Sequence, residues 1–232
     1  MLRARLIMNP EARGVGPAAA RVVVAALEAK FKLDHLETEA RATATEAARL
    51  AVEDGCEVVI AFGGDGLVNE VANGVSGTET ALAVIPGGTM NVFARNLGMP
   101  RNAIEAADRI IRAAERNRIR KMPIASVNGR VFTFACGCGF DAEAATRLEE
   151  RRVSKRRFGE PYFYATALAT FLASYRKKKP FLEVSGEFGS AQALGVLVMN
   201  GGTYAYLLGR PVRPVPRPRG EDLDNKLNVL LI

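Results

Sequence analysis

The sequence predicts an α/β protein, in which a parallel sheet with helices on both faces is followed by a mostly β half. Three observations lead to this fold class. Short apolar runs alternate with segments of helical periodicity up to about residue 122. Glycine-rich stretches at 63–66 and 87–88 follow two of these runs directly. Beyond residue 122 the pattern becomes mostly strand-like. We therefore expect an α/β domain over 1–122 and a mostly β domain over 123–232.

The first half contains four expected strands, separated by helical segments. Pro17 is placed to start a helix over 17–31, because proline is favoured at the first helical position. A second helix is expected over 43–55, and a further helix after each glycine-rich turn. This order implies parallel strands, whose carboxyl ends meet at one edge of the sheet, where ligands bind in such folds. The strands are expected at ARLIMNP (4–10), KLDHLET (32–38), CEVVIAF (56–62) and ALAVIP (81–86).

The second half begins with an expected hairpin over 121–139, turning at Asn128-Gly129. Two helices are expected over about 140–152 and 160–176. Three strands follow, and the last of them reaches Ile232 without a closing turn or polar tail. We therefore expect the natural protein to continue, so that the second domain is incomplete at its C-terminus. The strands are expected at FLEVSGEF (181–188), ALGVLVMNGG (193–202) and DNKLNVLLI (224–232).

The composition is ordinary for a folded, water-soluble chain, with 48% apolar and 25% charged residues. The uncharged aromatic stretch at 162–175 is too short to span a bilayer, which needs roughly 20 residues. The apolar piece at the N-terminus is too short for a signal peptide. We therefore expect a cytoplasmic protein. Three cysteines and a single histidine, His35, offer too few ligands for a zinc site, so buried thiols are expected.

The net charge of +7 is concentrated in basic runs at 116–121, 147–157 and 175–179. Such runs suit nucleic acid, anionic lipid or phosphate ligands, and they can equally form a solvated face. No zinc-finger or RNP-type pattern accompanies them, so no nucleic-acid partner is expected.

The stretch AFGGDGLVNEVANG (61–74) follows the third expected strand. Its glycines let the backbone approach a ligand closely, and their N–H groups, with the start of the next helix, favour an anion. Asn69 and Glu70 lie about one turn further on and can return a hydrogen bond to this loop. Taken alone, the stretch fits a tight turn as well as a phosphate site. The glycines are Gly63, Gly64 and Gly66.

Asp65 stands in the middle of these glycines, where an acid would repel phosphate. The residue makes chemical sense if it orders Mg²⁺, directly or through water, because the metal reverses the local charge.

Two more loops are expected at the same edge of the sheet. In the stretch IPGGTMNVFARNLG (85–98), Gly87 and Gly88 follow a strand, Thr89 is the expected helix N-cap, and Asn91 is expected on the first turn. After the first strand, Asn9-Pro10 begins the third loop. Loops of this kind on adjacent strand ends predict a bound nucleotide. No Walker loop occurs in the chain.

A dinucleotide-binding fingerprint is a further possibility at Gly137-x-Gly139-x-x-Ala142. It lies outside the parallel half and lacks the acidic residue expected about 20 positions later. We therefore do not favour it.

These motifs together resemble the diacylglycerol kinase catalytic domain family, which includes bacterial lipid kinases and sphingosine and ceramide kinases. The resemblance implies an α/β domain like that of NAD kinases and 6-phosphofructokinases, followed by a β-sandwich domain. It also implies ATP-dependent phosphorylation of a lipid hydroxyl, most simply that of diacylglycerol or a related lipid. The matching segments are NP (9–10), GGDGLVNEVANGV (63–75), IPGGTMNVFARNLG (85–98), GCGFDAEA (137–144) and VMNGG (198–202).

The loops and the resemblance together give a candidate site. Asp65 would order the metal and the phosphate, and the resemblance places the general base in a segment beyond residue 232. A structural Mg²⁺ would be held by Asp224, with Glu221 and Lys226 as backbone donors. The residues expected to bind ATP are Asn9, Pro10, Thr38, Gly63, Gly64, Asp65, Gly66, Leu67, Asn69, Glu70, Gly88, Thr89 and Asn91.

Three positions depart from the family pattern. Leu67 replaces the usual threonine, Val92 stands where many members have aspartate, and Asn225 replaces the glycine after the metal-binding Asp224. The first change removes one hydroxyl from the expected phosphate site.

The expected function is therefore that of a lipid kinase at an anionic membrane surface, with ATP and Mg²⁺ as cofactors and a homodimer as a possible assembly. One alternative is a nucleotide- or lipid-binding protein without kinase activity, because the base segment is absent from this sequence. Another is an NAD-type kinase of a soluble substrate. The helix expected over 162–175 is either core or one wall of a slot for an acyl chain.

Overall fold

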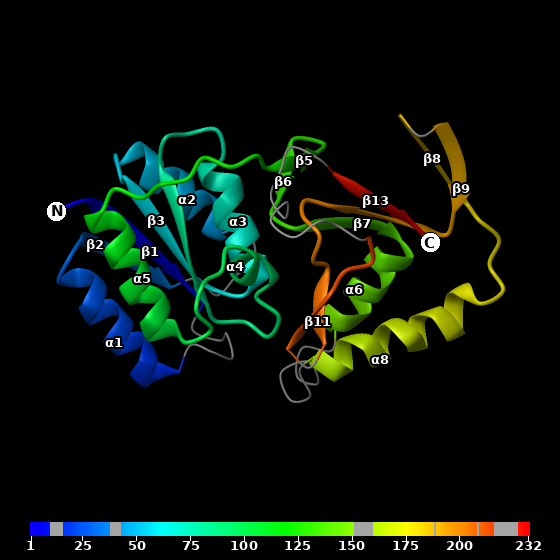
Figure 1. Cartoon of the computed structure of the whole chain (residues 1–232), viewed down its shortest axis with the longest axis horizontal. Helices are drawn as coiled ribbons and strands as arrows, with labels where there is room; N and C mark the ends of the chain where they lie inside the picture. Colours follow the sequence, from blue (N-terminus) through cyan, green and yellow to red (C-terminus); the bar gives the residue numbers. More distant parts are fainter. Residues whose placement is uncertain (10–15, 38–42, 151–159, 188, 208, 216–226) are drawn as a thin grey trace. The chain divides into compact units, whose positions relative to one another are not determined.

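The computed structural model describes residues 1–9, 16–37, 43–150, 160–187, 189–207, 209–215 and 227–232 (Figure 1). The chain forms two compact units, Met1–Thr133 and Phe134–Ile232. The hairpin that follows residue 122 is grouped with the first unit. The domain boundary at residue 122 remains a prediction, since these units are defined by packing alone.

The first unit is built on a parallel four-stranded sheet with strand order β2-β1-β3-β4. The four expected strands are all present. The central strand β3 is buried along its whole length, which agrees with its uninterrupted apolar sequence. The edge strand β2 is mostly exposed, and its sequence is correspondingly more polar. The bounds are β1 (Arg3–Met8), β2 (Lys32–Glu37), β3 (Val58–Gly63) and β4 (Ala81–Pro86).

Helices cover both faces of this sheet (Figure 1). One apolar cluster joins α1 and α5 to one face, through residues such as Leu6 and Ile60. A second cluster joins α2 and α3 to the other face, through Ile7 and Val59. Successive residues of a strand point to opposite faces, so each strand supplies both clusters. The helices are α1 (Pro17–Glu28), α2 (Thr43–Glu53), α3 (Asp65–Val75), α4 (Val92–Asn96) and α5 (Ala103–Glu115).

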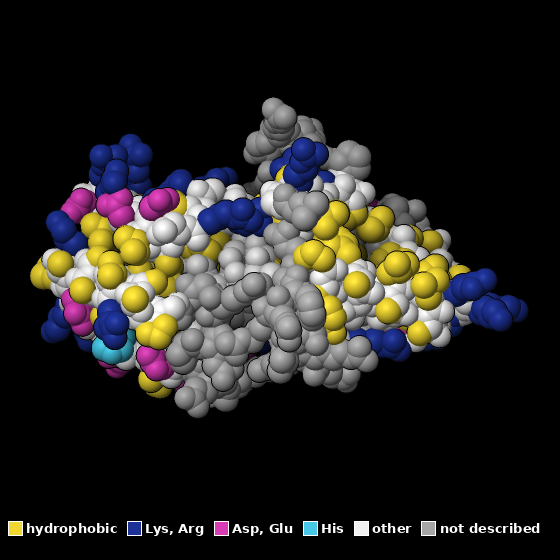
Figure 2. Space-filling view, turned by 90° about the horizontal axis from the view of Figure 1, so that it is seen from below, with side chains coloured by type: hydrophobic (Ala, Val, Ile, Leu, Met, Phe, Trp, Pro, Cys, Tyr) yellow, Lys and Arg dark blue, Asp and Glu magenta, His cyan; other side chains and the backbone are white. Residues whose placement is uncertain are grey.

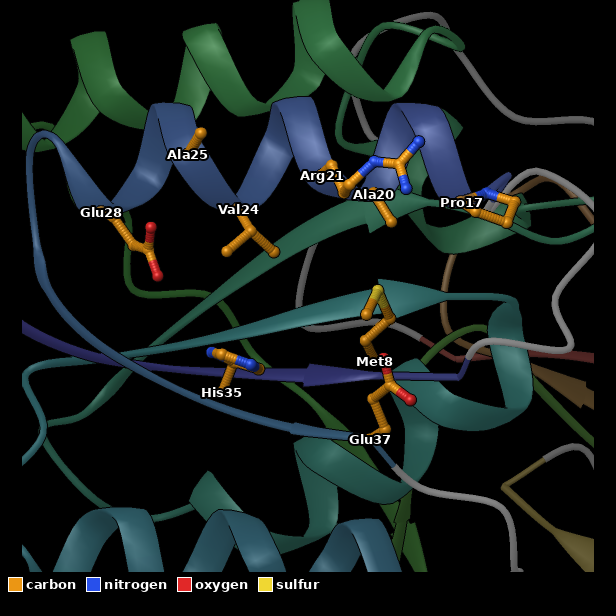
Figure 3. Close-up of a pocket in the computed structure, with 9 residues that line it drawn as sticks. All are labelled: Met8, Pro17, Ala20, Arg21, Val24, Ala25, Glu28, His35 and Glu37. Carbon is orange, nitrogen blue, oxygen red and sulfur yellow. The ribbon is translucent and has the colours of Figure 1, made fainter.

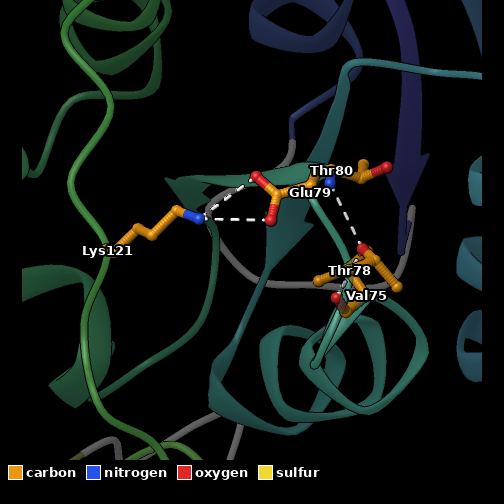
Figure 4. Close-up of polar contacts among 5 residues, drawn as sticks. All are labelled: Val75, Thr78, Glu79, Thr80 and Lys121. Carbon is orange, nitrogen blue, oxygen red and sulfur yellow. Dashed lines mark hydrogen bonds and ion pairs between the residues drawn. The ribbon is translucent and has the colours of Figure 1, made fainter.

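The turn between α3 and β4 shows where part of the basic run at 116–121 lies (Figure 4). The ammonium group of Lys121 pairs with the Glu79 carboxylate at 3.1 and 3.2 Å. Thr78 closes the same turn by donating its hydroxyl to the carbonyl of Val75. Both charged side chains are almost fully exposed, so the pair adds little stability. Because Glu79 precedes β4, Lys121 lies at the opposite end of this strand from the glycine-rich loops.

The predicted hairpin is confirmed as β5 (Ala125–Val127) and β6 (Arg130–Phe132). Asn128 and Gly129 both have positive φ, at 50° and 76°. This is the backbone geometry for which the Asn-Gly pair is favoured in two-residue hairpin turns.

Among its described residues, the second unit combines antiparallel strands with the helices α6 and α8. Its largest sheet has the order β13-β10-β7, and β8-β9 and β11-β12 form two-stranded ladders. The expected strands at 181–188 and 193–202 correspond to β8 and β10, and the expected helix over 160–176 corresponds to α8 and its continuation η1. The elements are β7 (Ala135–Gly139), α6 (Phe140–Glu150), α8 (Glu160–Thr170), the π-helical turn η1 (Phe171–Tyr175), β8 (Leu182–Gly186), β9 (Gly189–Ala193), β10 (Gly195–Met199), β11 (Ala205–Leu207), β12 (Arg210–Val212) and β13 (Asn228–Leu231).

Within the described part of the chain, no helix has both the length and the apolar character that a membrane crossing requires.

Candidate active site

The expected loops begin side by side at the carboxyl ends of β1, β3 and β4. The backbone N–H of Asn9 donates to the carbonyl of Phe62 at 3.2 Å, and Gly87 donates to that of Gly63 at 2.8 Å. The strand order places β2 and β3 on opposite sides of β1, so the sheet has a topological switch point between β1 and β3. Ligands of open α/β sheets bind in the crevice at such a point.

The loops after β3 and β4 touch through their backbones. A Cβ atom on Gly88 would lie 2.5 Å from the Cα atom of Gly64, and one on Gly64 would lie 3.3 Å from the Cα atom of Gly88. Glycine at position 88 is therefore required by packing within the protein. At Gly66, by contrast, an added Cβ atom meets nothing within 4 Å. The glycine at 66 leaves open space beside the first turn of α3.

Asp65 joins these two loops. It is the first residue of α3, and its Oδ1 atom accepts a hydrogen bond from the backbone N–H of Phe93 at 3.0 Å. Phe93 lies in the first turn of α4, so the carboxylate satisfies one of the N–H groups that a helix leaves without an intrahelical partner. The side chain is half-buried. This contact gives Asp65 a structural role that the sequence alone did not suggest.

The loop after β4 differs from the prediction at two residues. Asn91, not Thr89, precedes α4, and it adopts the left-handed conformation with φ 49°. The prediction of Thr89 as N-cap is therefore wrong, and Asn91 does not lie on the first helical turn. Instead the Asn91 side chain accepts from the N–H of Gly88 and donates to its carbonyl, each at 2.8 Å. Asparagine tolerates this backbone conformation and closes the loop with its own amide.

Asn69 makes different contacts from those expected. Its amide donates to the carbonyl of Val131 at 3.3 Å, and its Oδ1 atom accepts from the N–H of Thr133 at 2.9 Å. The prediction that this side chain returns a hydrogen bond to its own loop is wrong. Glu70, the other residue expected to do so, is half-buried, and its backbone carbonyl accepts from the hydroxyl of Thr45.

Asn73 is a residue that the sequence analysis missed. Its amide exchanges two hydrogen bonds of 2.9 Å with the backbone of Val131, so α3 holds strand β6 through two asparagines. The signal in the sequence is the spacing of Asn69 and Asn73, because residues four apart lie on the same face of a helix.

Leu67 packs into the second apolar cluster and is buried. Its side chain lies against Gly63, where an added Cβ atom would come within 2.6 Å of it. Any contact of Leu67 with a ligand would therefore use its backbone N–H.

Five of the expected site residues lie outside the described residues: Pro10, Thr38, Glu221, Asp224 and Lys226. The described residues contain no group of three or more His, Cys, Asp or Glu side chains arranged to hold a metal ion.

A cavity of about 380 Å³ lies between α1 and the ends of β1 and β2 (Figure 3). Side chains such as Val24 and Glu28 of α1 point toward Met8 and His35 on the strands. The full lining is Met8, Pro17, Ala20, Arg21, Val24, Ala25, Glu28, His35 and Glu37.

In the second unit, the motif GCGFDAEA places Asp141 in the first turn of α6. The hydroxyl of Tyr204 donates to the Asp141 carboxylate. Burial raises the pKa of Asp141, and the hydrogen bond from Tyr204 offsets part of that rise. A side chain on Gly137 would collide with this carboxylate, which explains the glycine. Strand β7 pairs antiparallel with β10, so this glycine motif does not belong to a dinucleotide-binding βαβ unit.

Glycine-rich loops at the switch point of a parallel sheet define the class of α/β proteins that bind ligands at their strand ends. The family follows from comparison with known proteins. A family model described as the diacylglycerol kinase catalytic domain matches residues 3–124, more than half of the chain. The chain belongs to this family, and the expectation from its motifs is confirmed.

Curated relatives named diacylglycerol kinase share this similarity. The chain is 34% identical to the diacylglycerol kinase of Bacillus subtilis (strain 168) over 206 residues, which cover 85% of this chain and 65% of the relative. It is 36% identical to that of Staphylococcus saprophyticus over 138 residues, covering 56% and 43% of the two chains. The chain thus spans about two thirds or less of the length of these relatives.

Solved structures support the fold class. A crystal structure of a diacylglycerol kinase from Bacillus anthracis str. Sterne matches with a TM-score of 0.71 and 30% identity, over 99% of this chain and 73% of that chain. A putative diacylglycerol kinase from the same organism matches with a TM-score of 0.72 and 29% identity. The α/β fold class with a second, strand-rich unit is confirmed.

Proposed function

We propose that this chain belongs to a lipid kinase that transfers the γ-phosphoryl group of ATP to the hydroxyl of diacylglycerol or a related lipid. The observation that carries the proposal is that three loops begin on adjacent strand ends at the switch point of the parallel sheet. The relatives named diacylglycerol kinase support a lipid as the acceptor.

The phosphates of ATP would lie over Gly66. The open space at this glycine admits a ligand that a side chain would displace. The first N–H groups of α3 have no intrahelical partner and, with the helix dipole, favour negative charge. The contact between Gly64 and Gly88 would hold the loop after β4 against the same phosphates. Thr89 and Asn9, which are both half-buried, would also contact the nucleotide.

Asp65 would orient the nucleotide and its Mg²⁺. When bound, Mg²⁺ neutralises charge on the phosphates during phosphoryl transfer. Among the described residues, Asp65 is the one proposed to order this Mg²⁺. The second, structural Mg²⁺ site is proposed for Glu221, Asp224 and Lys226, which lie outside the described residues. What Asp65 itself does is to keep the loops after β3 and β4 together through the N–H of Phe93. Catalysis in this class depends mainly on such positioning.

The acceptor lipid requires the protein to reach a membrane. We infer a cytoplasmic protein that associates peripherally with an anionic membrane surface, and a homodimer is the assembly to test for.

The test is transfer of labelled γ-phosphate to diacylglycerol, phosphatidylglycerol, a sphingoid base and NAD, with Asp65→Asn as the variant. Asparagine keeps an oxygen that can accept from Phe93, so the loop contact is retained while the charge is lost. We expect transfer to a lipid that falls by about 10²–10³-fold in the variant. The matched control is Asp108→Asn, because Asp108 lies on the exposed side of α5, paired with Arg112.

Other outcomes of this experiment separate the alternatives. ATP binding without transfer to any lipid would favour a binding protein without kinase activity. Transfer to NAD alone would favour an NAD-type kinase. Unchanged lipid transfer by Asp65→Asn would remove Asp65 from the mechanism.

A further inference from the structure

The end of α8 exposes large apolar side chains. Leu168 and Leu172 are 60% and 55% exposed, Phe171 is 39% exposed, and Phe181, just beyond the helix, is 52% exposed. Leu168, Phe171 and Leu172 are spaced three and four residues apart, so they share one face of the helix. In Figure 2, hydrophobic side chains gather on the right, with Lys and Arg side chains at their margin. We call the four side chains the apolar face.

The opposite side of this helix is anchored in the second unit. Thr170 is fully buried and Tyr175 is 3% exposed. The Tyr175 ring packs edge-on against Phe140, with ring centroids 5.2 Å apart. The partly exposed Phe171 also reaches the Phe140 ring, at 6.1 Å between centroids, so it lies at the boundary between the inner side and the apolar face. The helix is therefore fixed by its inner side. The helix continues into the π-helical turn η1, which changes which residues face outward. Such turns are frequent at functional sites.

Four consecutive basic residues border the apolar face: Arg176, Lys177, Lys178 and Lys179, all exposed. None of them forms an ion pair with a residue that the structure describes. Lys178 bends back, and its Nζ atom lies 4.5 Å from the ring centroid of Tyr175 and 4.8 Å from that of Phe181. A cationic group and an apolar group are thus in contact at Lys178 and Phe181. The acidic residues that follow on β8 and in its turn are Glu183 and Glu187.

We propose that the apolar face and the basic residues 176–179 dock the protein on an anionic lipid bilayer. Apolar side chains beside lysines suit the boundary between headgroups and acyl chains, where lysine stems lie along apolar surface and their charges meet anionic headgroups. An anionic bilayer matches both features, because its acyl chains accept the exposed leucines and its headgroups attract the four cations. The identity of the partner rests on the proposed function, because the acceptor lipid lies in such a bilayer.

The test measures binding to vesicles by flotation, without ATP. The vesicles contain phosphatidylcholine alone or mixed with phosphatidylglycerol. We expect binding to the mixed vesicles that weakens as salt is raised, because exposed charges are screened. The double variant Leu168→Gln/Leu172→Gln should lower the affinity by about tenfold or more. The double variant Lys177→Gln/Lys179→Gln should lower it by about tenfold at low salt.

Matched controls come from exposed residues of the first unit. Leu36→Gln/Leu50→Gln replaces two exposed leucines, and Lys32→Gln/Arg118→Gln removes two exposed charges. These variants should bind vesicles like the wild type. The replaced side chains in all four variants are exposed, and circular dichroism with thermal unfolding checks that each variant is folded.

Three results would overturn the docking proposal: equal binding to both kinds of vesicle, wild-type binding by the leucine variant, or a wild-type dimer in solution that the leucine variant converts to a monomer. The last result would assign the face to a second copy of the chain. The two proposals fail separately. Vesicle binding without phosphate transfer contradicts only the kinase function, and transfer without vesicle binding contradicts only the docking surface.

Discussion

The carboxylate of Asp65 accepts a hydrogen bond from the backbone N–H of Phe93, 28 residues further along the chain, at 3.0 Å. This single contact connects the loop after β3 to the first turn of α4. The acid in this glycine-rich loop therefore has a structural role in the folded protein.

Removing this acceptor should destabilise the protein. In Asp65→Ala the buried N–H of Phe93 loses its partner, so we expect the free energy of unfolding to fall by about 1–2 kcal/mol. Asp65→Asn keeps an acceptor oxygen and should lose clearly less. Urea denaturation of both variants measures the difference. Equal losses would show that the charge of Asp65, not its hydrogen bond, matters for stability.

The contact between Gly64 and Gly88 predicts that the loops tolerate no side chain there. Gly88→Ala would place a Cβ atom 2.5 Å from the Gly64 Cα atom, so the backbones must separate. We expect the free energy of unfolding to fall by about 1–3 kcal/mol and ATP binding to weaken with it. Thermal unfolding and calorimetric titration with ATP measure the two effects. A Gly88→Ala variant as stable as the wild type would contradict the close packing of these loops.

Gly66 should behave in the opposite way. An alanine Cβ atom there meets nothing in the protein, and alanine favours the helix, so stability should be unchanged or rise by up to about 1 kcal/mol. ATP affinity should nevertheless fall by about tenfold, because the methyl group occupies the space proposed for phosphate. Gly74→Ala is the contrasting control: its Cβ atom would lie 2.4 Å from that of Ala48, so this variant should lose stability. Unchanged ATP affinity in Gly66→Ala would place the phosphates elsewhere.

The two asparagines on α3 predict local protection of strand β6. Asn73→Ala leaves the backbone of Val131 without two hydrogen bonds, and we expect a loss of about 1–3 kcal/mol. Hydrogen exchange of the Val131 amide, which loses its acceptor, should accelerate more than exchange in β1 or β3. The control is Asn102→Ala, which removes the N-cap of α5 and should lower global stability without this local effect.

The pKa of Asp141 predicts a dependence of stability on pH. Burial raises this pKa above the ordinary value of about 3.9, so the folded state favours the protonated carboxyl. The stability that Asp141 contributes is therefore fully present below about pH 3.9 and is lost as the pH rises through the raised pKa of the folded state. The Asp141→Asn side chain stays neutral at every pH. The melting temperature of this variant should therefore rise relative to that of the wild type as the pH is raised through this range. Thermal unfolding at a series of pH values measures that difference, and a constant difference would contradict it.

The sequence was sufficient for the parallel half of the fold. The central strand β3 is apolar on both faces and the helices follow a clear period, so packing and local propensity agree. The strands missed in the second unit were β9, β11 and β12. β9 reads GSAQA, which has neither apolar alternation nor branched residues, and β11 and β12 are three residues long. Their pairing depends on neighbouring strands and not on their own composition.

In the candidate site, the sequence located the loops but not the contacts between them. The glycines at 64 and 88 were recognised as features of two separate turns, and only the folded sheet brings them together. Threonine and asparagine are both favoured before a helix. Asn91 takes this position because it can adopt a left-handed backbone and bond to Gly88. The partners of Asp65 and Asn69 lie 28 and more than 60 residues away, beyond any local pattern.

Helix α3 connects the loop after β3 to strand β6. Its first turn contains the glycine proposed to bind phosphate. Asn69 and Asn73, one and two turns later, form hydrogen bonds to the backbone of Val131 and Thr133. The backbone hydrogen bonds of the helix join these two ends into one continuous element. Strand β6 leads directly into β7 and the Asp141 motif of the second unit. One helix therefore supports both the loop proposed to bind phosphate and the hairpin that precedes the second unit.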